Sequence, residues 1–267
     1  MSLAACVTTP PPPTSSPPFV LGERQTKALV LTRVASPWWA PDFLITGKFV
    51  DSIPEYAAVP ALEHKAYTLS EDRRFGGLYL WPDRASAERF FDEAWHARVR
   101  KARGVDGDVQ ILDALWTVQG DAPSGTTLPH HGLRTEGAVT WLWAQASDGV
   151  TARLEALARL HGVPAGVVRV SLVTSPGGGV GLVALWNSRA RARAFWTQAR
   201  LDEARTALGA DAQLTWFRAP VFLDVAADRA SRAPGSLITT PGSLGLAADG
   251  GSSATAAAGA RTNEAPR

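Results

Sequence analysis

Leu80-Trp81-Pro82-Asp83-Arg84-Ala85-Ser86-Ala87-Glu88-Arg89-Phe90 is matched 105 residues later by Leu185-Trp186-Asn187-Ser188-Arg189-Ala190-Arg191-Ala192-Arg193-Ala194-Phe195. Six of the eleven positions are identical, and both tryptophans are among them. The alignment extends towards the N-terminus without a gap, so that Ser70 falls on Ser175 and Gly76 on Gly181. A match at constant spacing indicates an internal repeat, and a repeat constrains the fold before any single element does.

The elements around each copy are predicted in the same order. In the first copy, apolar runs predict strands at 28–32, 62–69, 77–81 and 109–118, with one helix at 41–51 and a second, capped by Asp83, before Gly104. In the second copy, strands are predicted at 139–144, 167–174, 180–186 and 213–225. A helix from Val150 to Leu160, ended by Gly162, and another capped by Ser188 complete it.

Each copy therefore has the order β-α-β-β-α-β, which is typical of a ferredoxin-like α+β unit with both helices on one face of an antiparallel sheet. The strand at 77–81 is apolar on both faces, with Leu78 and Leu80 alternating with Tyr79 and Trp81. A strand that is apolar on both faces is covered on both faces. We therefore expect two tandem ferredoxin-like units packed sheet to sheet, as a pseudo-dimer within one chain.

The domain boundaries follow from composition. Residues 27–119 form the first unit, 120–137 a polar linker with glycine and proline, and 138–226 the second unit. Residues 1–26 are predicted to be a disordered Pro-rich tether, because residues 7–18 are mostly Pro, Thr and Ser. Residues 227–267 are predicted to be a disordered tail rich in Ala, Gly, Ser and Thr.

Charge and cysteine content exclude several classes of function. The chain of 267 residues has 27 basic and 25 acidic side chains, a balance that does not favour nucleic acid as a partner. No stretch reaches the roughly 20 apolar residues of a transmembrane helix. The single cysteine, Cys6, excludes an intrachain disulfide, and no spacing of histidines and carboxylates predicts a metal site.

Leu3-Ala4-Ala5-Cys6 is similar to a bacterial lipobox, in which the cysteine is lipid-modified. The Pro/Ser/Thr segment that follows is typical of a lipoprotein tether, but no basic and apolar leader precedes Leu3. Two interpretations stay open. Either the true start lies upstream and Cys6 anchors an envelope lipoprotein, or Cys6 is an ordinary residue in a cytoplasmic protein.

The first copy resembles the YdhR-like monooxygenases of the antibiotic-biosynthesis-monooxygenase superfamily, which are dimeric α/β barrels. The resemblance covers about 27–118 and rests on four segments: Val59-Pro60-Ala61-Leu62 with Lys65, Thr68-Leu69-Ser70-Glu71-Asp72, Gly76-Gly77-Leu78-Tyr79-Leu80-Trp81, and Asp83-Arg84-Ala85-Ser86-Ala87 with Phe90. It implies a pocket in the barrel interior and cofactor-independent oxygenation of an aromatic or polyketide-like compound. The second copy has Val170 at the position of Lys65, which puts a second active site in doubt.

Oxygenation without a cofactor needs an enclosed apolar cavity, a base and hydrogen-bond donors for the developing charge. His64 and Lys65 are the candidate catalytic residues. They are adjacent on a strand and therefore face opposite sides, so only one of them can line a given cavity. A salt bridge to a helix is the alternative for Lys65, and a satisfied histidine in the core or at the surface is the alternative for His64.

Aromatic residues are the candidate ligand contacts. Tyr67, Tyr79, Trp81 and Trp95 are predicted to stack on an aromatic substrate, with packing in the core as the competing role. Trp38 and Trp39, in a loop flanked by prolines, are predicted to form a lid or a partner contact. Glu71-Asp72-Arg73-Arg74 is expected to be a solvated turn.

The sequence thus predicts a tandem YdhR-like barrel, with a monooxygenase activity towards a small hydrophobic or aromatic molecule and no cofactor. The alternative is a ligand-binding or structural barrel without catalysis. Because the fused pair already supplies the partner of a dimeric barrel, we expect a monomer.

Overall fold

The computed structural model describes residues 26–120 and 134–226, which we call the first half and the second half. The first half contains β1 (Ala28–Ala35), α1 (Asp42–Asp51), α2 (Ile53–Ala57), β2 (His64–Ser70), β3 (Arg74–Trp81), α3 (Arg84–Phe90), α4 (Glu93–Arg103) and β4 (Asp108–Gln119). The second half contains β5 (Arg134–Gln145), α5 (Val150–His161), β6 (Val167–Thr174), β7 (Gly179–Trp186), α6 (Arg189–Phe195), α7 (Gln198–Leu208) and β8 (Gln213–Asp224). The order of strands and helical segments is the same in both halves, apart from the short α2.

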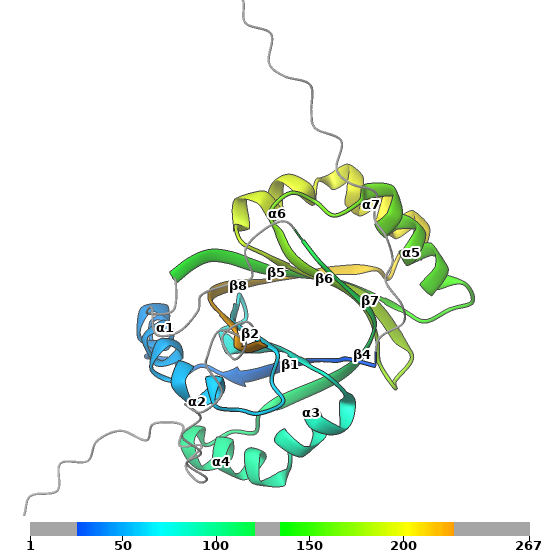
Figure 1. Ribbon diagram of the computed structural model, residues 1–267. Helices are drawn as coiled ribbons and strands as arrows, with labels where there is room; N and C mark the ends of the chain where they lie inside the picture. The colour runs from blue at the N-terminus through cyan, green and yellow to red at the C-terminus, as the bar shows by residue number, and fades with distance from the viewer. Residues whose placement is uncertain (1–25, 121–133, 227–267) are drawn as a thin grey trace, which may run out of the picture.

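The strands of the described residues form one closed antiparallel barrel in the order β1-β3-β2-β8-β5-β7-β6-β4. Each half contributes four neighbouring strands, β4-β1-β3-β2 and β8-β5-β7-β6. The helices of the first half cover one outer side of this barrel and those of the second half cover the opposite side (Figure 1). The protein is therefore an α+β fold built on an eight-stranded barrel.

Two seams join the halves. At one, β2 pairs with β8, and at the other, β4 pairs with β6. The sequence predicts sheets that pack face to face; in the structure the same sheets are also hydrogen-bonded along both edges. Pairing satisfies the backbone groups that an edge strand would leave open, and it closes the barrel.

Alternation along the strands sends side chains to two different cores. On β3, Leu78 and Leu80 belong to a cluster in the barrel interior to which both halves contribute, together with Val183 and Phe217 from the second half. Tyr79 belongs to the separate cluster under the helices of the first half. The prediction that this strand is buried on both faces is confirmed, since Leu78 to Trp81 are all buried.

The repeated motif makes the same contact in both halves. The rings of Trp81 and Phe90 have centroids 5.1 Å apart at 42°, and those of Trp186 and Phe195 have centroids 5.4 Å apart at 43°. Thus the residues that align in sequence also occupy equivalent positions in the packing.

The second helical segment of each half differs from its prediction. The sequence predicts one continuous helix after Asp83, but the structure has two, broken at Phe91. Asp92 begins the second, and its carboxylate accepts a hydrogen bond from the Trp95 amide at 2.9 Å. Aspartate competes with the helical backbone in this way and favours a new N-cap over a helix interior.

Several predictions lie outside the described residues. These are the lipobox with Cys6, the disordered tether, the disordered tail and residues 121–133 of the linker. Strand β5 begins at Arg134, within the predicted linker and five residues before the predicted strand.

Candidate functional site

The largest cavity described lies outside the barrel, between the sheet of the first half and its helices. It has a volume of about 420 Å³ and is lined by Thr32, Val34, Pro37, Trp39, Ala40, Leu44, Ile45, Lys48, Phe49, Asp51, Ser52, Glu55, Tyr56, Lys65, Tyr67, Phe75, Gly76, Tyr79, Trp95, Val99 and Arg103. Small-molecule sites have this size and this mixture of aromatic walls with few polar groups. The resemblance implies a pocket in the barrel interior, whereas this cavity lies outside it; the interior contains a cluster of buried apolar side chains.

Lys65 projects from β2 into this cavity. It is only 2% exposed, and its Nζ lies 2.8 Å from the ring centroid of Tyr56, 3.9 Å from that of Tyr67 and 4.8 Å from that of Tyr79. Tyr67 and Tyr79 share its side of the sheet, and Tyr56 comes from α2. The amine is therefore enclosed by three tyrosine rings, which we call the tyrosine cage.

Burial lowers the pKa of Lys65 well below its ordinary value, and the nearby carboxylate of Glu55 only partly offsets this effect. The ring faces attract an ammonium ion, but loss of hydration is the larger influence on a fully buried amine. Burial raises the pKa of Glu55 above its ordinary value, and the positive charges of Lys65 and Arg98 offset only part of that rise. Burial thus disfavours the charged form of this amine relative to an amine in water.

The hydroxyl groups of the cage have defined partners. The Tyr67 hydroxyl lies 2.9 Å from the Ser52 hydroxyl. Tyr79 is hydrogen-bonded to Thr32 and Tyr56, and burial raises its pKa to about 12. Burial also raises the pKa of Tyr56 and of Tyr67 well above the ordinary value. The three phenols therefore stay protonated at neutral pH and can donate hydrogen bonds.

Gly76 and Gly77 make room for this arrangement. A Cβ on Gly76 would lie 1.9 Å from the main-chain oxygen of Thr32, and a Cβ on Gly77 would lie 2.9 Å from the ring of Tyr79. Any side chain at either position would displace β1 or the tyrosine. The Gly-Gly pair of the sequence motif is thus a requirement of the site's packing.

The cavity opens beside an exposed apolar surface. Trp39 and Leu44 line the cavity and are 63% and 47% exposed, and Trp38 and Phe43 beside them are 87% and 67% exposed. Exposed aromatic side chains gathered in this way mark a binding surface. Trp39 is therefore placed at the mouth of the cavity, whereas Trp38 projects into solvent.

His64 does not share the site with Lys65. It is 2% exposed and faces the barrel interior, where its ring lies 6.4 Å from that of Phe222. The opposite orientation of these neighbours agrees with the prediction from strand alternation. Trp81 is also absent from the cavity lining; it packs on Phe90 and Phe91 in the core.

The structure therefore brings together Lys65, Tyr67, Tyr79, Trp95 and Trp39 of the predicted residues, and leaves out His64, Trp81 and Trp38. Sequence reasoning missed Tyr56, Glu55 and Ser52. These lie in or beside α2: Ser52 comes just before it, and Glu55 and Tyr56 fall between Pro54 and Pro60, a segment that the prolines suggest is irregular. Pro54 instead stands in the first turn of a short helix, where proline is well tolerated.

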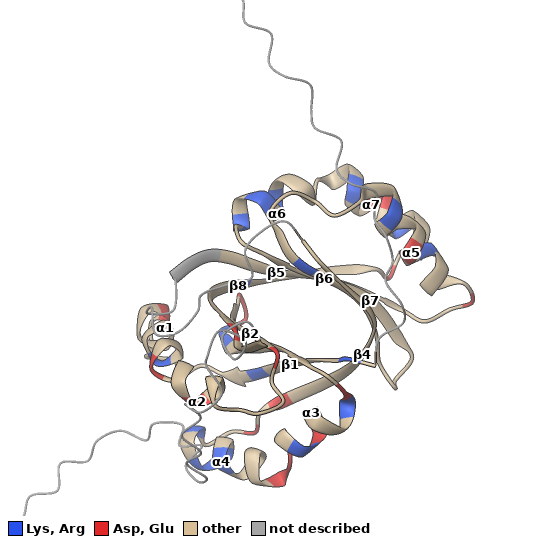
Figure 2. Cartoon of the chain, viewed as in Figure 1, with Lys and Arg blue, Asp and Glu red and all other residues tan. Residues whose placement is uncertain are grey.

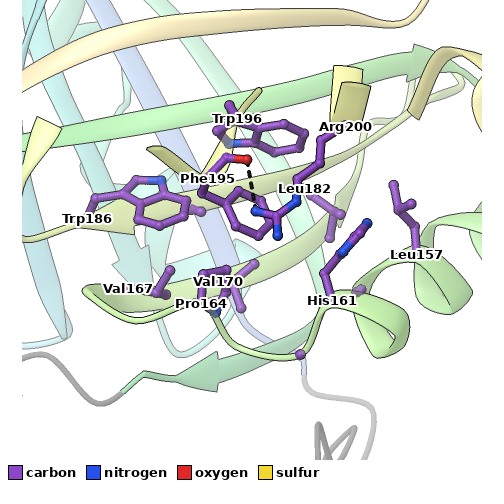
Figure 3. Close-up of a pocket in the computed structure, with 13 residues that line it drawn as sticks. Leu157, His161, Pro164, Val167, Val170, Leu182, Trp186, Phe195, Trp196 and Arg200 are labelled. Carbon is purple, nitrogen blue, oxygen red and sulfur yellow. Dashed lines mark hydrogen bonds between the residues drawn. The ribbon is translucent and has the colours of Figure 1, made fainter. Parts of the chain in front are cut away.

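The second half has a smaller cavity in the equivalent place (Figure 3), of about 50 Å³. Val170 stands where the first half has Lys65, Ala184 where it has Tyr79, and Arg200 where it has Trp95. The Arg200 guanidinium lies over the ring of Phe195 and donates to its carbonyl oxygen at 2.8 Å (Figure 3). This cavity has neither the amine nor the phenol of the first.

Charged residues of both signs are interspersed on the helices of both halves (Figure 2). In residues 26–120 and 134–226, no helix is long and apolar enough to cross a membrane. Over the same residues, no three metal-ligating side chains among His, Cys, Asp and Glu come together.

No family model matches the chain, and no curated protein matches its sequence. Among solved structures, it is similar to an anthrone oxidase-like protein, with 14% identity and a TM-score of 0.51 over 78% of this chain and 98% of that one. It is similar to a candidate monooxygenase of Fusobacterium nucleatum, with 7% identity and a TM-score of 0.52 over 75% and 95% of the chains. It is also similar to a candidate monooxygenase of Lactobacillus acidophilus, with 6% identity and a TM-score of 0.52 over 75% of this chain and 97% of that one. These likenesses establish a shared fold.

Proposed function

We propose that the protein is a cofactor-independent monooxygenase whose substrate, a small aromatic or polyketide-like compound, binds in the cavity of the first half. The observation that carries this proposal is the buried amine of Lys65 inside the tyrosine cage. A group with a strongly lowered pKa in an aromatic-lined cavity is a candidate for proton transfer. In the competing role, a salt bridge to a helix, the partner would be Glu55 on α2, whose carboxylate only partly offsets the effect of burial on the pKa of Lys65.

The reaction needs one base and one molecule of oxygen. Neutral Lys65 takes a proton from an acidic C–H or O–H group of the substrate and becomes an ammonium. The substrate anion transfers an electron to O₂, and the two radicals combine as a peroxide. Loss of water from the peroxide, with a second C–H proton, leaves a ketone or quinone. One oxygen atom stays in the product and the other leaves as water, so that CH₂ and O₂ become C=O and H₂O.

The tyrosine cage supplies the electrostatic part. Phenols that remain protonated donate hydrogen bonds to the oxygen on which the negative charge develops. Tyr79 is a suitable donor because hydrogen bonds with Thr32 and Tyr56 already fix the position of its hydroxyl group. The aromatic walls also keep water from the peroxide. An anthrone is a substrate of the required kind, and the name of one structural neighbour, an anthrone oxidase-like protein, agrees with this chemistry.

We also infer that the two halves arose by duplication of one YdhR-like unit, and that the fused pair works as a monomer. The equivalent packing of Trp81 on Phe90 and of Trp186 on Phe195 supports the duplication. The presence of Val170 and Ala184 in the second cavity, in place of an amine and a phenol, supports a single active site, in the first half.

The test is oxygen uptake with a panel of anthrones and hydroquinones, using ¹⁸O₂ to trace the product oxygen. The wild-type protein is expected to consume one O₂ per ketone formed and to place one labelled atom in it. Lys65→Met is expected to lower kcat by about 100-fold or more, as loss of a general base does. Lys101→Met, at an exposed position of α4 that does not line the cavity, is the matched control and should keep its activity.

Failure to accelerate oxygen uptake above the rate in buffer, across the whole panel, contradicts the oxygenase. Ligand binding that persists in the same samples, and that Lys65→Met abolishes, identifies a non-catalytic binding barrel.

A further inference from the structure

A second cleft lies on the outer surface of the β2–β8 seam, between the two halves. It has a volume of about 270 Å³ and is lined by Ser36, Ala40, Asp42, Leu69, Ser70, Glu71, Arg73, Arg74, Arg189, Trp216, Phe217 and Arg218. Four of these side chains are arginines and two are carboxylates. The cleft therefore carries an excess of positive charge, although the chain as a whole is nearly neutral.

The arginines come from both halves. Arg218 on β8 pairs with Asp42 on α1, and Arg189 on α6 lies 3.7 Å from Glu71 in the β2–β3 turn. Arg74 pairs with Asp72 at 3.2 Å. These pairs are partly exposed, so each is weak and can exchange its carboxylate for another anion.

Arg73 differs from the other three. Its Nη2 donates to the main-chain oxygens of Trp38 at 3.0 Å, of Pro37 at 3.3 Å and of Ala40 at 3.5 Å. Among the described residues, no carboxylate forms a salt bridge with it. The positive charge of Arg73 is therefore not offset by a carboxylate in this way, and it would attract an incoming anion.

The backbone of Arg73 is a second, independent sign of a role for its side chain. Its φ is +58°, in the left-handed region that disfavours any residue with a Cβ. The equivalent position in the second half is Gly178, with φ of +83°. Both turns make the same hydrogen bond, from the amide of Arg73 to Ser70 and from that of Gly178 to Ser175. Glycine is therefore sufficient for the turn itself, and what the arginine adds is its side chain, which anchors the Trp38 segment and brings a positive charge to the cleft.

We propose that this cleft is a binding site for a small dianion, a phosphate monoester or a dicarboxylate, held by Arg73, Arg74, Arg189 and Arg218. Guanidinium groups match the oxygens of both anions with paired hydrogen bonds. The site is distinct from the cavity of Lys65. It would bind its anion whether or not that cavity oxidises anything.

The test is calorimetric titration of the full chain with inorganic phosphate and, separately, with succinate, against chloride at constant ionic strength. At least one dianion is expected to bind at a single saturable site with a dissociation constant on the order of 1 mM. Arg73→Gly is expected to weaken binding by about tenfold, the loss of a charge-assisted hydrogen bond. Because Gly178 occupies the same turn position, this variant should fold.

Two further variants complete the experiment. Asp42→Asn removes a competing carboxylate and is expected to tighten binding by about threefold. Arg159→Gln, in the last turn of α5, removes the same charge outside the cleft, where Arg159 pairs with Glu155, and should bind as wild type does. The proposal is overturned if neither dianion saturates, or if Arg159→Gln weakens binding as much as Arg73→Gly does.

Discussion

At the scale of single residues, Lys65 determines what the cavity can do. A charged ammonium in this position would have lost nearly all its hydration, and three aromatic faces return only part of that energy. The chain therefore carries a destabilising residue at a position where an apolar one would pack. Retention of such a residue agrees with a function that needs its amine.

The first prediction concerns stability. Because burial lowers the pKa of Lys65 in the folded state, the unfolded chain binds more protons between that pKa and the unfolded value of about 10.4. The free energy of unfolding therefore rises with pH across this window. Lys65→Met should remove the slope and raise the free energy of unfolding at neutral pH by about 2 kcal/mol.

Urea unfolding at pH values from 6 to 9.5 measures this effect. The gain in Lys65→Met over wild type should shrink as the pH rises. Lys48→Met, which removes a lysine whose side chain is about half exposed, is the control. An equal slope in all three proteins would mean that Lys65 is charged and well solvated.

The sequence predicted to which side of the sheet each of these side chains points, but not which residues it contacts. The alternation of a strand is local, so it correctly separated His64 from Lys65. The cage depends on Tyr56, which reaches Lys65 from α2, a short helix with a proline in its first turn. No local pattern connects the two, because only the packing of α2 on the sheet brings them together.

At the scale of elements, the segment between β1 and α1 controls access to the cavity. It carries Trp38 and Trp39, and the Arg73 side chain and main chain hold it against the β2–β3 turn. One tryptophan of the pair lines the cavity and the other does not. Substitution of Trp38 therefore serves as a control for substitution of Trp39.

The prediction for this segment is a difference between two alanine variants. Trp39→Ala should weaken binding of an aromatic ligand about tenfold or more, because it removes one wall of the cavity mouth. Trp38→Ala should change ligand affinity by less than about twofold. Fluorescence titration with a bound anthrone or hydroquinone analogue measures both, and equal losses would show a partner or surface role rather than a wall of the cavity.

Strands and helices were largely predictable, and the exceptions have physical causes. The strands were found because each is apolar over a run of suitable length. The break between α3 and α4 was missed because Phe90, Phe91 and Trp95 keep a helical spacing across it. The cap at Asp92 outweighs that spacing, and Thr197 caps α7 in the same way, accepting from the Arg200 amide at 3.4 Å.

At the scale of the whole molecule, the two seams make the halves depend on each other. The barrel interior is a single apolar cluster with members on both sides, including Leu29 and Leu112 from the first half and Val139 and Phe222 from the second. Neither half can cover its inner sheet face alone. The repeat in the sequence predicts two sheets. The pairing between β4 and β6 could not be predicted in the same way, because it joins residues far apart in the chain and no local sequence pattern indicates it.

The prediction is that residues 1–120, expressed alone, do not form a stable monomer. The exposed inner face and the free edges of β2 and β4 should drive the fragment to self-associate. Light scattering after size-exclusion chromatography gives the result, with the full chain as control. A folded, monomeric fragment with a cooperative unfolding transition would show that the interior cluster is dispensable.

One chain supplies both sides of the closed barrel, and this has a consequence for its evolution. In a barrel assembled from two identical chains, every substitution appears twice, so an active site can be lost only in both places at once. Here a substitution changes one side and leaves the other untouched. The two halves therefore need not match, and Val170 and Ala184 stand in the second half where the first has Lys65 and Tyr79. A single chain that contributes both sides of the barrel thus allows one side to carry a site while the other side differs from it in sequence.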